Sequence, residues 1–585
     1  MESAALSSVS ELSRVGRPRG EQADPACESI TNVDGNVTYT QSGVVWVIAP
    51  ELLSEFQQIG GIPHGSWANW PGFSVVKTGP HRAVYRCELP SGEYFVKHFR
   101  VRSWRAFFQN LVRPCKADLE SKSAKRISDA GLRTIETLAV GRASHRGVVF
   151  ENYLISRSIP NTIPLDQFAL NLRDCQPRRR RFLRDRLAAA LGQLAGQLHA
   201  AGIEHLDFHA GNVLVQEGAD DSLKLWIIDV HAVRFGRELS AGRAAGNLAS
   251  LYQFFRRVGT RTDRLRFFRA FASVHALPPG AASLKTFEKR CLQLSQQLWN
   301  RADRAWRRGN RHQHKLSGPA YGRSVIALNY DWLRLVCEDP ELLFQDVTGW
   351  CKQSGSHRVA AVKIPVPDGM ATAFCKSVEH QGWRRIYTRA RGSAAHRAWD
   401  VGHALLRRGI ATPRPLLYLE HRGPKNDREY LLTEAIPHSI TLAEFCQTRV
   451  PSLTTGGRAA WLAGVSQRLA SQLKWMHDCG YDHRDLKFQN ILVAADPAAR
   501  EIWLLDLEAV RRWPWLPQER AVQNLARLNV SAFHLKGLRL TERLRFLWHY
   551  LTPAEAVHWK HWWRLIRNRS QKKCRQNQLR RRPLT

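Results

Sequence analysis

The chain contains the stretch His483-Arg-Asp-Leu-Lys-Phe-Gln-Asn490, which is followed directly by the apolar run Ile-Leu-Val. An acid, a base and an amide at these spacings, placed just before a strand-like segment, suit a loop that moves phosphate. Asp485 could accept the proton of an attacking hydroxyl, Lys487 could contact the transferring phosphate, and Asn490 could hold a metal ion. The stretch therefore predicts a phosphoryl-transfer site.

An earlier segment repeats this design. His205-Leu-Asp-Phe-His-Ala-Gly-Asn212 is followed by Val-Leu-Val, so that Asp207 and Asn212 recur 278 residues later as Asp485 and Asn490. Other segments recur in the same order: GPHRAV from Gly79 as GSHRVA from Gly355, YFVKHF with Lys97 as AFCKSV with Lys376, and WIIDVHAV with Asp229 as WLLDLEAV with Asp506. The loops between them vary by only a few residues, which indicates a duplicated domain and not a short-period solenoid.

The duplication divides the chain into five segments. We expect an N-terminal extension without ordered structure at 1–41, a first domain at 42–308 and a second domain at 328–570. The residues between the domains, 309–327, have the Gly, Pro and charge of an exposed linker, and 571–585 form a basic tail.

Each copy begins with strand patterns and continues with helical ones. SVVKTG, AVYRCEL and YFVKHF in the first copy predict an antiparallel β-meander. A helical segment that ends at Gly131 or Gly409 follows. Helices with the periodicity of buried elements at 186–202 and 458–480 then end in glycine just before the Asp-containing loops. The order is that of an α+β fold.

Composition limits the class of protein. A length of 585 residues allows three or four domain-sized units, and 44% apolar residues are ordinary for a packed globular chain. The formal net charge of +36 would concentrate anions such as nucleic acid, acidic lipid, nucleotide or a phosphorylated glycolipid. The 11 cysteines are scattered and form no CxxC pair, so neither a disulfide framework nor a zinc site is indicated and a reducing compartment is expected.

No targeting segment is evident in the sequence. The N-terminus MESAALSSVSELSRVGRPRG is polar and lacks the apolar core of a secretory signal, and no run approaches 18 apolar residues. We therefore expect a cytoplasmic protein that contacts a membrane only peripherally, at the cytosolic face.

Phosphoryl transfer requires a positioned γ-phosphate, balanced charge and an oriented acceptor hydroxyl. One carboxylate and one amide suffice as protein ligands of Mg²⁺, which keeps several waters. The second copy offers Asp485 as base, Lys487 for the γ-phosphate, Lys376 for the α- and β-phosphates, and Asn490 and Asp506 as metal ligands. The first copy offers the corresponding set, Asp207, His209, Lys97, Asn212 and Asp229.

Each of these residues alone has a simpler explanation. An Asp before a strand is commonly a turn residue, a strand Lys is usually solvated, and an Asn beside an apolar run can cap a turn. The same residues recur twice in one order, however, which favours a kinase-type site over independent structural roles.

HRDLKFQNILV resembles the catalytic loop of the protein-kinase-like superfamily, and HLDFHAGNVLV resembles the form found in its small-molecule and sugar kinases. The closer likeness is to the lipopolysaccharide kinases of the Kdo/WaaP type, since RAWDVGHALLRRGIATPRPLLYLE (397–420) resembles their segment before the hinge and LLTEAIPHSITL resembles the hinge. The resemblance implies two tandem bilobal protein-kinase-like domains. Each would have an antiparallel β N-lobe and a mainly helical C-lobe, with ATP and Mg²⁺ bound between the lobes.

The glycine loop and the segment after the metal Asp depart from the protein-kinase pattern. Neither copy has a full G-x-G-x-x-G loop, so Gly79 and Gly355 are the remaining phosphate-loop candidates. The metal Asp is followed by Val230-His231 or Leu507-Glu508 in place of Phe-Gly, which argues against an ordinary activation loop.

The expected partner of the strand lysine is present in one copy. Glu120 lies eleven residues before Gly131 and is the candidate partner of Lys97. The same count back from Gly409 gives Ala398, so the second copy lacks an obvious carboxylate for its lysine. We expect both nucleotide sites to be complete or nearly so, with decay of one copy into a regulator as the alternative.

Basic residues gather at the end of each copy. AWRRGNRHQHK and WWRLIRNRSQKK place Trp306 and Trp562-Trp563 beside cations, and Arg178–Arg181 form a further run. The plain interpretation is a solvated face. The functional one is docking on an anionic bilayer, where each basic residue near the surface contributes about 1 kcal/mol. Nucleic acid is less favoured, because no DNA- or RNA-binding motif accompanies the charge.

These features support one hypothesis and two rivals. The hypothesis is an ATP-dependent kinase that phosphorylates a hydroxyl of a lipopolysaccharide-core sugar, Kdo or heptose, or a related glycolipid. The rivals are a protein or small-molecule kinase and a scaffold in which one or both copies are pseudokinases. The acceptor and the oligomeric state are beyond what the residues determine.

Overall fold

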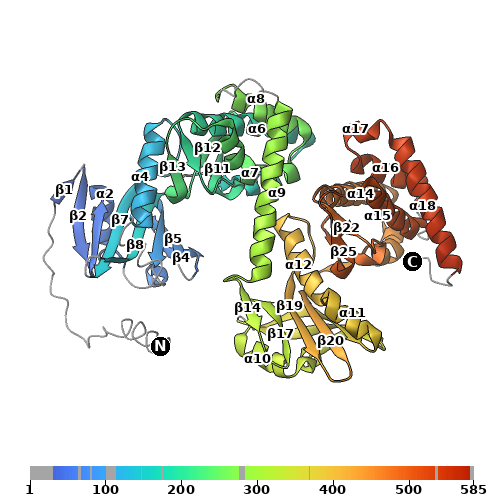
Figure 1. Cartoon of the computed structure of the whole chain (residues 1–585). Coiled ribbons are helices and arrows are strands. Elements are labelled where there is room, and N and C mark those ends of the chain that lie inside the picture. Colours follow the sequence, from blue (N-terminus) through green and yellow to red (C-terminus); the bar gives the residue numbers. More distant parts are fainter. Residues whose placement is uncertain are drawn as a thin grey trace. The chain divides into compact units, whose positions relative to one another are not determined.

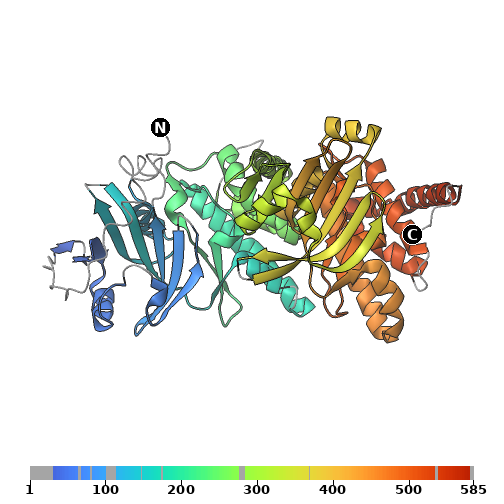
Figure 2. The ribbon, with the colours of Figure 1, turned by 90° about the horizontal axis from the view of Figure 1, so that it is seen from below.

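The computed structural model describes residues 31–33, 35–63, 67–79, 82–100, 114–145, 148–172, 175–275, 284–367, 369–533 and 538–579. The chain divides into two compact units, residues 1–295 and 296–585; Figures 1 and 2 show their elements in the colours of the sequence. In the part of the chain that is described, no helix has both the length and the apolar character needed to cross a membrane.

Unit 1 begins with an eight-stranded antiparallel sheet of order β1-β2-β3-β7-β8-β6-β5-β4. Its strands are β1 (Thr31–Val33), β2 (Asn36–Gln41), β3 (Val44–Ile48), β4 (Phe73–Lys77), β5 (Arg82–Leu89), β6 (Gly92–Arg100), β7 (Thr137–His145) and β8 (Val148–Arg157). Ala83, Tyr85 and Cys87 are buried in alternation along β5, which is the period-2 pattern that predicted the meander β4-β5-β6. Helices α2 (Pro50–Gln58) and α4 (Lys116–Asp129) complete this lobe.

The second lobe of unit 1 is mainly helical. It contains β9 (Thr162–Pro164), α5 (Leu165–Asn171), α6 (Pro177–Ala200), β10 (Ile203–His205), β11 (Val213–Glu217), β12 (Leu223–Ile227), β13 (Val233–Phe235), α7 (Ala241–Val258) and α8 (Arg261–Ala272). Helices α6 and α8 approach closely because position 192 is glycine: a Cβ at Gly192 would lie 2.3 Å from the carbonyl oxygen of Phe267. Gly202, at φ +69°, turns the chain from α6 into β10 and the Asp207 loop, as predicted.

Unit 2 repeats this order. Its sheet, β14-β15-β19-β20-β18-β17-β16, is built from β14 (Gln313–Leu316), β15 (Ala320–Val325), β16 (Val347–Ser354), β17 (His357–Val366), β18 (Gly369–His380), β19 (Pro415–Arg422) and β20 (Asp427–Glu434). Helices α10 (Tyr330–Glu338), α11 (Trp383–Arg391) and α12 (Ala394–Arg407) accompany the sheet. Helix α12 holds the place in unit 2 that α4 holds in unit 1, between the third meander strand and the last strand pair.

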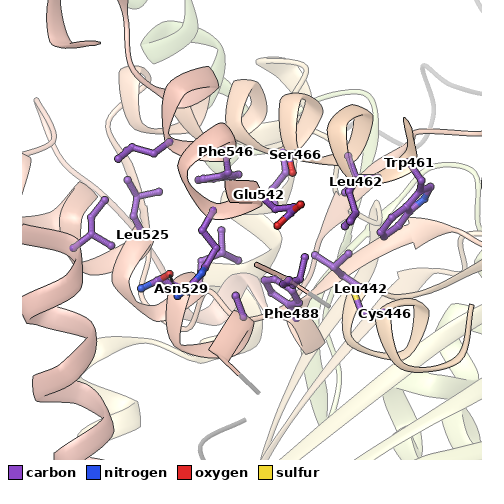
Figure 3. A pocket seen from close by; sticks show the side chains of 18 of the residues that line it. Leu442, Cys446, Trp461, Leu462, Ser466, Phe488, Leu525, Asn529, Glu542 and Phe546 are labelled. Carbon is purple, nitrogen blue, oxygen red and sulfur yellow. Dashed lines mark hydrogen bonds between the residues drawn. The ribbon is translucent and has the colours of Figure 1, made fainter. Parts of the chain in front are cut away.

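The helical lobe of unit 2 carries the second Asp loop. It contains β21 (Ser439–Thr441), α13 (Leu442–Thr448), α14 (Thr455–Asp478), β22 (Tyr481–His483), β23 (Ile491–Ala494), β24 (Ile502–Leu504), β25 (Val510–Arg512), α15 (Gln518–Phe533), α16 (Leu540–Tyr550), α17 (Pro553–Ala556) and α18 (Trp559–Leu579). An apolar cavity of about 80 Å³ lies among these helices (Figure 3) and is lined by Leu442, Trp461, Phe488, Leu525, Phe546 and other side chains. It contains none of the predicted site residues and belongs to the core of the lobe.

Three boundaries differ from those that composition suggested. The segment 309–327 is not an exposed linker, because β14 and β15 pair with each other and β15 pairs with β19, with Gly318 and Pro319 in the turn between them. The extension 1–41 is ordered at its end, since Val37 and Tyr39 are buried on β2; residues 1–30 lie outside the described residues. The tail is helical as far as Leu579, the last residue of α18.

The helix α9 (Leu284–Arg308) contributes to both units. In unit 1 the Ser295 hydroxyl donates to the Ala249 carbonyl at 2.6 Å. In unit 2 the buried Asp303 accepts from Arg407 and Arg408, both at 2.8 Å, and from Arg512 at 3.3 Å. Burial opposes ionisation of Asp303, but the bonds from Arg408 and Arg407 outweigh it and lower the pKa of this carboxyl. The first domain therefore ends inside α9 and not at Arg308.

Replacing Asp303 by Ala should destabilise unit 2 strongly. The change leaves three guanidinium groups around an empty buried position, and breaking one side of a buried ion-pair network typically costs about 3–5 kcal/mol. Urea denaturation of the full chain, followed by a probe of unit 2, would give the free energy of unfolding. The exposed Asp346→Ala is the matched control and should change it by less than about 0.5 kcal/mol; a loss below about 1 kcal/mol for Asp303→Ala would contradict the role given to the network.

Candidate nucleotide and phosphoryl-transfer sites

In unit 2 the structure brings the predicted loop residues together. The Asn490 side-chain amide donates to the Asp485 carbonyl at 2.8 Å and to its carboxylate at 3.0 Å. Lys487 Nζ lies 3.2 Å from the same carboxylate. Because the nitrogen of the Asn490 amide is used by Asp485, its oxygen faces the other way and is available to a cation. The Asp485 side chain is 46% exposed, so an acceptor molecule can reach it.

A buried histidine fixes this loop to the strand that carries Asp506. His483 donates through Nε2 to the Leu505 carbonyl at 2.8 Å, while its Nδ1 accepts from the Asp485 backbone N–H at 3.4 Å. Burial lowers the pKa of His483. The ring is therefore neutral near pH 7 with its proton on Nε2, as both hydrogen bonds require.

Asp506 is held next to Asn490 by the backbone. The Leu505 N–H donates to the Asn490 carbonyl at 2.9 Å, and Asp506 itself adopts a left-handed conformation at φ +56°. Few residues other than glycine, Asn and Asp adopt this conformation readily, and it recurs at functional sites. An amide oxygen and a carboxylate on adjacent segments are the oxygen ligands that Mg²⁺ prefers, so these residues fit that ion.

The strand lysine of unit 2 has two acidic partners. Lys376 Nζ lies 3.1 Å from Asp506 and 2.9 Å from Glu508. Burial disfavours the ammonium, but the two carboxylates, Glu508 first, outweigh it and raise the pKa of Lys376. Burial raises the pKa of Glu508, and the neighbouring Lys376 ammonium only partly offsets this effect.

Glu508 is a residue that the sequence analysis missed. The helix position that would normally supply the lysine partner is Ala398 on α12, and its side chain is fully buried and lines the cleft beside Lys376. Glu508 supplies the carboxylate from the opposite wall, two residues after Asp506. The available signal was a glutamate in Asp506-Leu-Glu, where the first copy has His231.

These groups line a cleft of about 470 Å³ between the two lobes of unit 2. Its apolar walls include Val359, Phe374, Leu431, Ile436, Leu492 and Leu505. A largely apolar cleft with a few convergent charged groups is typical of a small-molecule site. Thr433, Glu434 and Ile436, from the segment that resembles the hinge, also line it.

Unit 1 keeps the same loop architecture. The Asn212 amide donates to the Asp207 carbonyl at 2.9 Å, and His205 bonds the Ile228 carbonyl at 3.1 Å. His209 lies where the second copy has Lys487, with Nε2 3.5 Å from the Asp207 carboxylate. Asp229, like Asp506, has a left-handed backbone, at φ +61°.

The charges around the strand lysine differ in unit 1. Lys97 forms a buried ion pair with Glu120 of α4, as predicted, and lies 3.6 Å from Asp229. Asp229 also accepts from Arg82 at 3.0 Å and is bonded by His231 at 2.9 Å. Burial alone would raise the pKa of Asp229, but the His231 bond and the two cations outweigh it and hold that pKa far below its usual value.

Arg82 was also missed by the sequence analysis, although GPHR and GSHR repeat an arginine at the start of the same strand in both copies. Its counterpart Arg358 turns away and pairs with Glu341 at 2.7 Å. Gly79 and Gly355 lie in the turns that precede β5 and β17, the strands next to the lysine strands. Gly355 has φ +36°.

Comparisons with known proteins point to one family. The model of the "Lipopolysaccharide kinase (Kdo/WaaP) family" matches residues 76–271 and 374–567, together more than half of the chain. The 3-deoxy-D-manno-octulosonic acid kinases of three Xanthomonas campestris pv. campestris strains are each 32% identical over 159 residues, which is 26% of this chain and 56% of theirs. The chain thus spans little more than half the length of these curated relatives. A solved structure of WaaP in complex with acyl carrier protein aligns with a TM-score of 0.33 at 23% identity, over 43% of this chain and 98% of that chain.

A carboxylate introduced on α12 should restore the ATP binding that is lost when Glu508 is replaced. Glu508→Gln removes one of the two charges on Lys376 and should weaken ATP binding by about tenfold or more, since hydrogen bonds to charged groups are worth about 1.5–3 kcal/mol. Adding Ala398→Glu returns a carboxylate from α12, the source used in unit 1, and should recover at least part of the affinity. Calorimetric titration of ATP into the full chain would measure both.

The exposed Glu501→Gln serves as the control for charge loss alone and should bind ATP as the parent does. If Glu508→Gln bound ATP normally, or if the double variant bound no better than the single one, Glu508 would not be the lysine partner.

Proposed function

Because the chain belongs to the lipopolysaccharide kinase (Kdo/WaaP) family, we propose that it is an ATP-dependent kinase that phosphorylates a sugar hydroxyl of the lipopolysaccharide core or a related glycolipid. The observation that carries this proposal is a chain of contacts in unit 2. Lys376 and Asp506 line one cleft and lie 3.1 Å apart. Leu505, beside Asp506, bonds the Asn490 carbonyl, and the Asn490 side chain bonds the Asp485 carboxylate. Phosphoryl transfer requires that the reacting groups are positioned and that the phosphate charge is balanced, and these side chains can do both.

Asp485 acts as the general base in this scheme. It takes the proton of the acceptor hydroxyl, whose oxygen bonds to the γ-phosphorus while the bond from that phosphorus to the β–γ bridging oxygen breaks and ADP leaves. Asn490 keeps the carboxylate oriented by donating to it at 3.0 Å. Lys487, 3.2 Å from Asp485, can contact the γ-phosphate from the same side.

ATP lies in the 470 Å³ cleft, with the adenine at the hinge and the α- and β-phosphates at Lys376. Gly355, in the turn before β17, is the candidate for contact with the phosphates. Asn490 and Asp506 would hold Mg²⁺, which when bound balances the phosphate charge. Unit 1 offers the same roles through Asp207, His209, Asn212, Asp229, Lys97, Glu120 and Gly79.

A Kdo acceptor is favoured over heptose for one reason. The curated relatives named above are 3-deoxy-D-manno-octulosonic acid kinases, although the match covers only 56% of their length. The acceptor pocket itself would lie beside the half-buried Asp485 and the exposed Arg484.

Such an acceptor is lipid-linked, so we place the protein in the cytoplasm and peripherally at the cytosolic face of the inner membrane. Exposed cations on α18 support this: Arg564, Arg567, Arg569, Lys572 and Arg575. The tryptophans predicted to assist them are engaged in the fold: Trp562 is buried, Trp563 lines the apolar cavity of Figure 3, and Trp306 stacks on Trp399 with ring centroids 5.6 Å apart. The basic face alone remains as the supporting feature, with nucleic acid as a disfavoured alternative.

A second function is favoured for unit 1 by one contact. Arg82 places a cation directly on Asp229, where a metal ion would bind. Unit 1 would then be a nucleotide-binding regulator, the pseudokinase alternative, while unit 2 performs the transfer.

Replacing each candidate base in turn should show how much each unit contributes to the kinase activity. A general base typically contributes 10²–10⁴ in rate, so Asp485→Ala should reduce kcat by about that factor with Kdo-containing lipid A precursor as acceptor. Asp207→Ala should change kcat by less than about threefold if unit 1 is a regulator. Transfer of ³²P from labelled ATP would measure both, and full activity of the double variant would disprove the roles of both carboxylates.

Analysis of the lipopolysaccharide of a strain lacking the protein would identify the acceptor sugar. Mass spectrometry of core oligosaccharide from a strain lacking the protein should show the loss of one phosphate, about 80 mass units by general chemistry, on the Kdo residue. A phosphate lost from heptose would assign that sugar instead. An unchanged core, together with phosphorylation of protein or of a small metabolite in vitro, would favour the other kinase alternative.

A further inference from the structure

Helix α11 (Trp383–Arg391) exposes two large apolar side chains, Trp383 and Ile386. It follows the last residues of β18 and lies beside β20 at the edge of the unit 2 lobe (Figure 1). Trp383 is 71% exposed and Ile386 is 72% exposed, the two highest values among the described large apolar side chains of this sheet lobe. Surface helices of globular domains normally turn such residues toward the core.

The inner face of α11 is polar and is firmly bound. Arg389 makes a double hydrogen bond with the Asp427 carboxylate of β20, at 2.6 and 2.8 Å. Arg385 lies one turn earlier on the same face and donates to the carbonyls of Pro424 and Lys425, at 2.7 and 3.2 Å. Asp427 is buried, and these cations lower its pKa, Arg389 first. The helix is therefore fixed with its apolar face outward and cannot turn it in without breaking these bonds.

The surroundings of the exposed face are cationic. The sequence WRRIYTRAR contains no acid, and its Arg385 and Arg389 are engaged on the inner face. The adjoining turn between β19 and β20 adds Arg422 and Lys425, both exposed. An outward Trp and Ile bordered by cations is the arrangement of an element that lies in the headgroup region of an anionic bilayer.

We propose that α11 is a membrane-contact element that inserts Trp383 and Ile386 into the surface of an anionic lipid bilayer. Arg422 and Lys425 would meet the lipid phosphates at its border. A bilayer fits better than a protein partner because, among the described side chains, the apolar face consists of two residues and the adjoining turn presents the cations Arg422 and Lys425. This attachment does not require phosphoryl transfer, so it and the proposed kinase activity can fail separately.

Vesicle co-sedimentation of the full chain tests the proposal. Vesicles of one part phosphatidylglycerol and three parts phosphatidylcholine should bind the parent protein, and pure phosphatidylcholine should bind it at least tenfold more weakly. Trp383→Ser combined with Ile386→Ser should weaken binding to the anionic vesicles at least tenfold, because both apolar groups that enter the surface are gone. Both substitutions are at exposed positions, and an unchanged thermal midpoint would confirm that the fold is retained.

The matched control is Trp515→Ser with Leu335→Ser, an exposed pair elsewhere on unit 2, at 77% and 59% exposure. It should bind the anionic vesicles within threefold of the parent. Equal losses in the two double variants, a loss below threefold for the α11 variant, or equal binding of the parent to neutral vesicles would each overturn the proposal. Failure of the parent to bind either vesicle would overturn it in favour of a protein occupant.

Discussion

The hydrogen bond from a buried, neutral histidine to the carbonyl before the candidate metal-binding Asp is the constraint on which each site depends. His483 bonds Leu505 and His205 bonds Ile228, at 2.8 and 3.1 Å. In both units burial lowers the histidine pKa, which keeps the acceptor nitrogen free for the backbone N–H of Asp485 or Asp207, the candidate bases. One imidazole ring thus joins the loop of the candidate base to the segment of the candidate metal ligand. The distance between these two carboxylates is therefore set by backbone hydrogen bonds.

Much of the fold could be predicted because the same motifs recur in the same order in both halves of the chain. Glycines at the helix ends, Gly131, Gly202, Gly409 and Gly480, all have positive φ in the structure, so the turns that launch strands and loops were identifiable from residue type alone. The strand and helix order then followed from local periodicity, and the tandem arrangement from the repeated motifs.

What could not be predicted depends on partners distant in sequence. The segment 309–327 looks like a linker because its two short strands flank Gly318 and Pro319, and only pairing of β15 with β19 reveals it as sheet. The domain boundary inside α9 depends on Asp303 meeting arginines more than a hundred residues away. Glu508 and Arg82 likewise gain meaning only from the position of the strand lysine and the metal Asp.

The two units keep the backbone scaffold and exchange the charges around the lysine. A buried ammonium requires a nearby carboxylate, because an unpaired charge in the interior is costly. Unit 1 takes that carboxylate from Glu120 on a helix, and unit 2 takes it from Glu508 in the short 3-10 helix Leu507–Ala509. Because Glu508 follows Asp506 by two residues, it occupies the position that His231 has in unit 1, where that histidine bonds Asp229 instead. The loss of the helix glutamate at Ala398 is therefore compatible with a complete site only in the copy that acquired an acid at this second position.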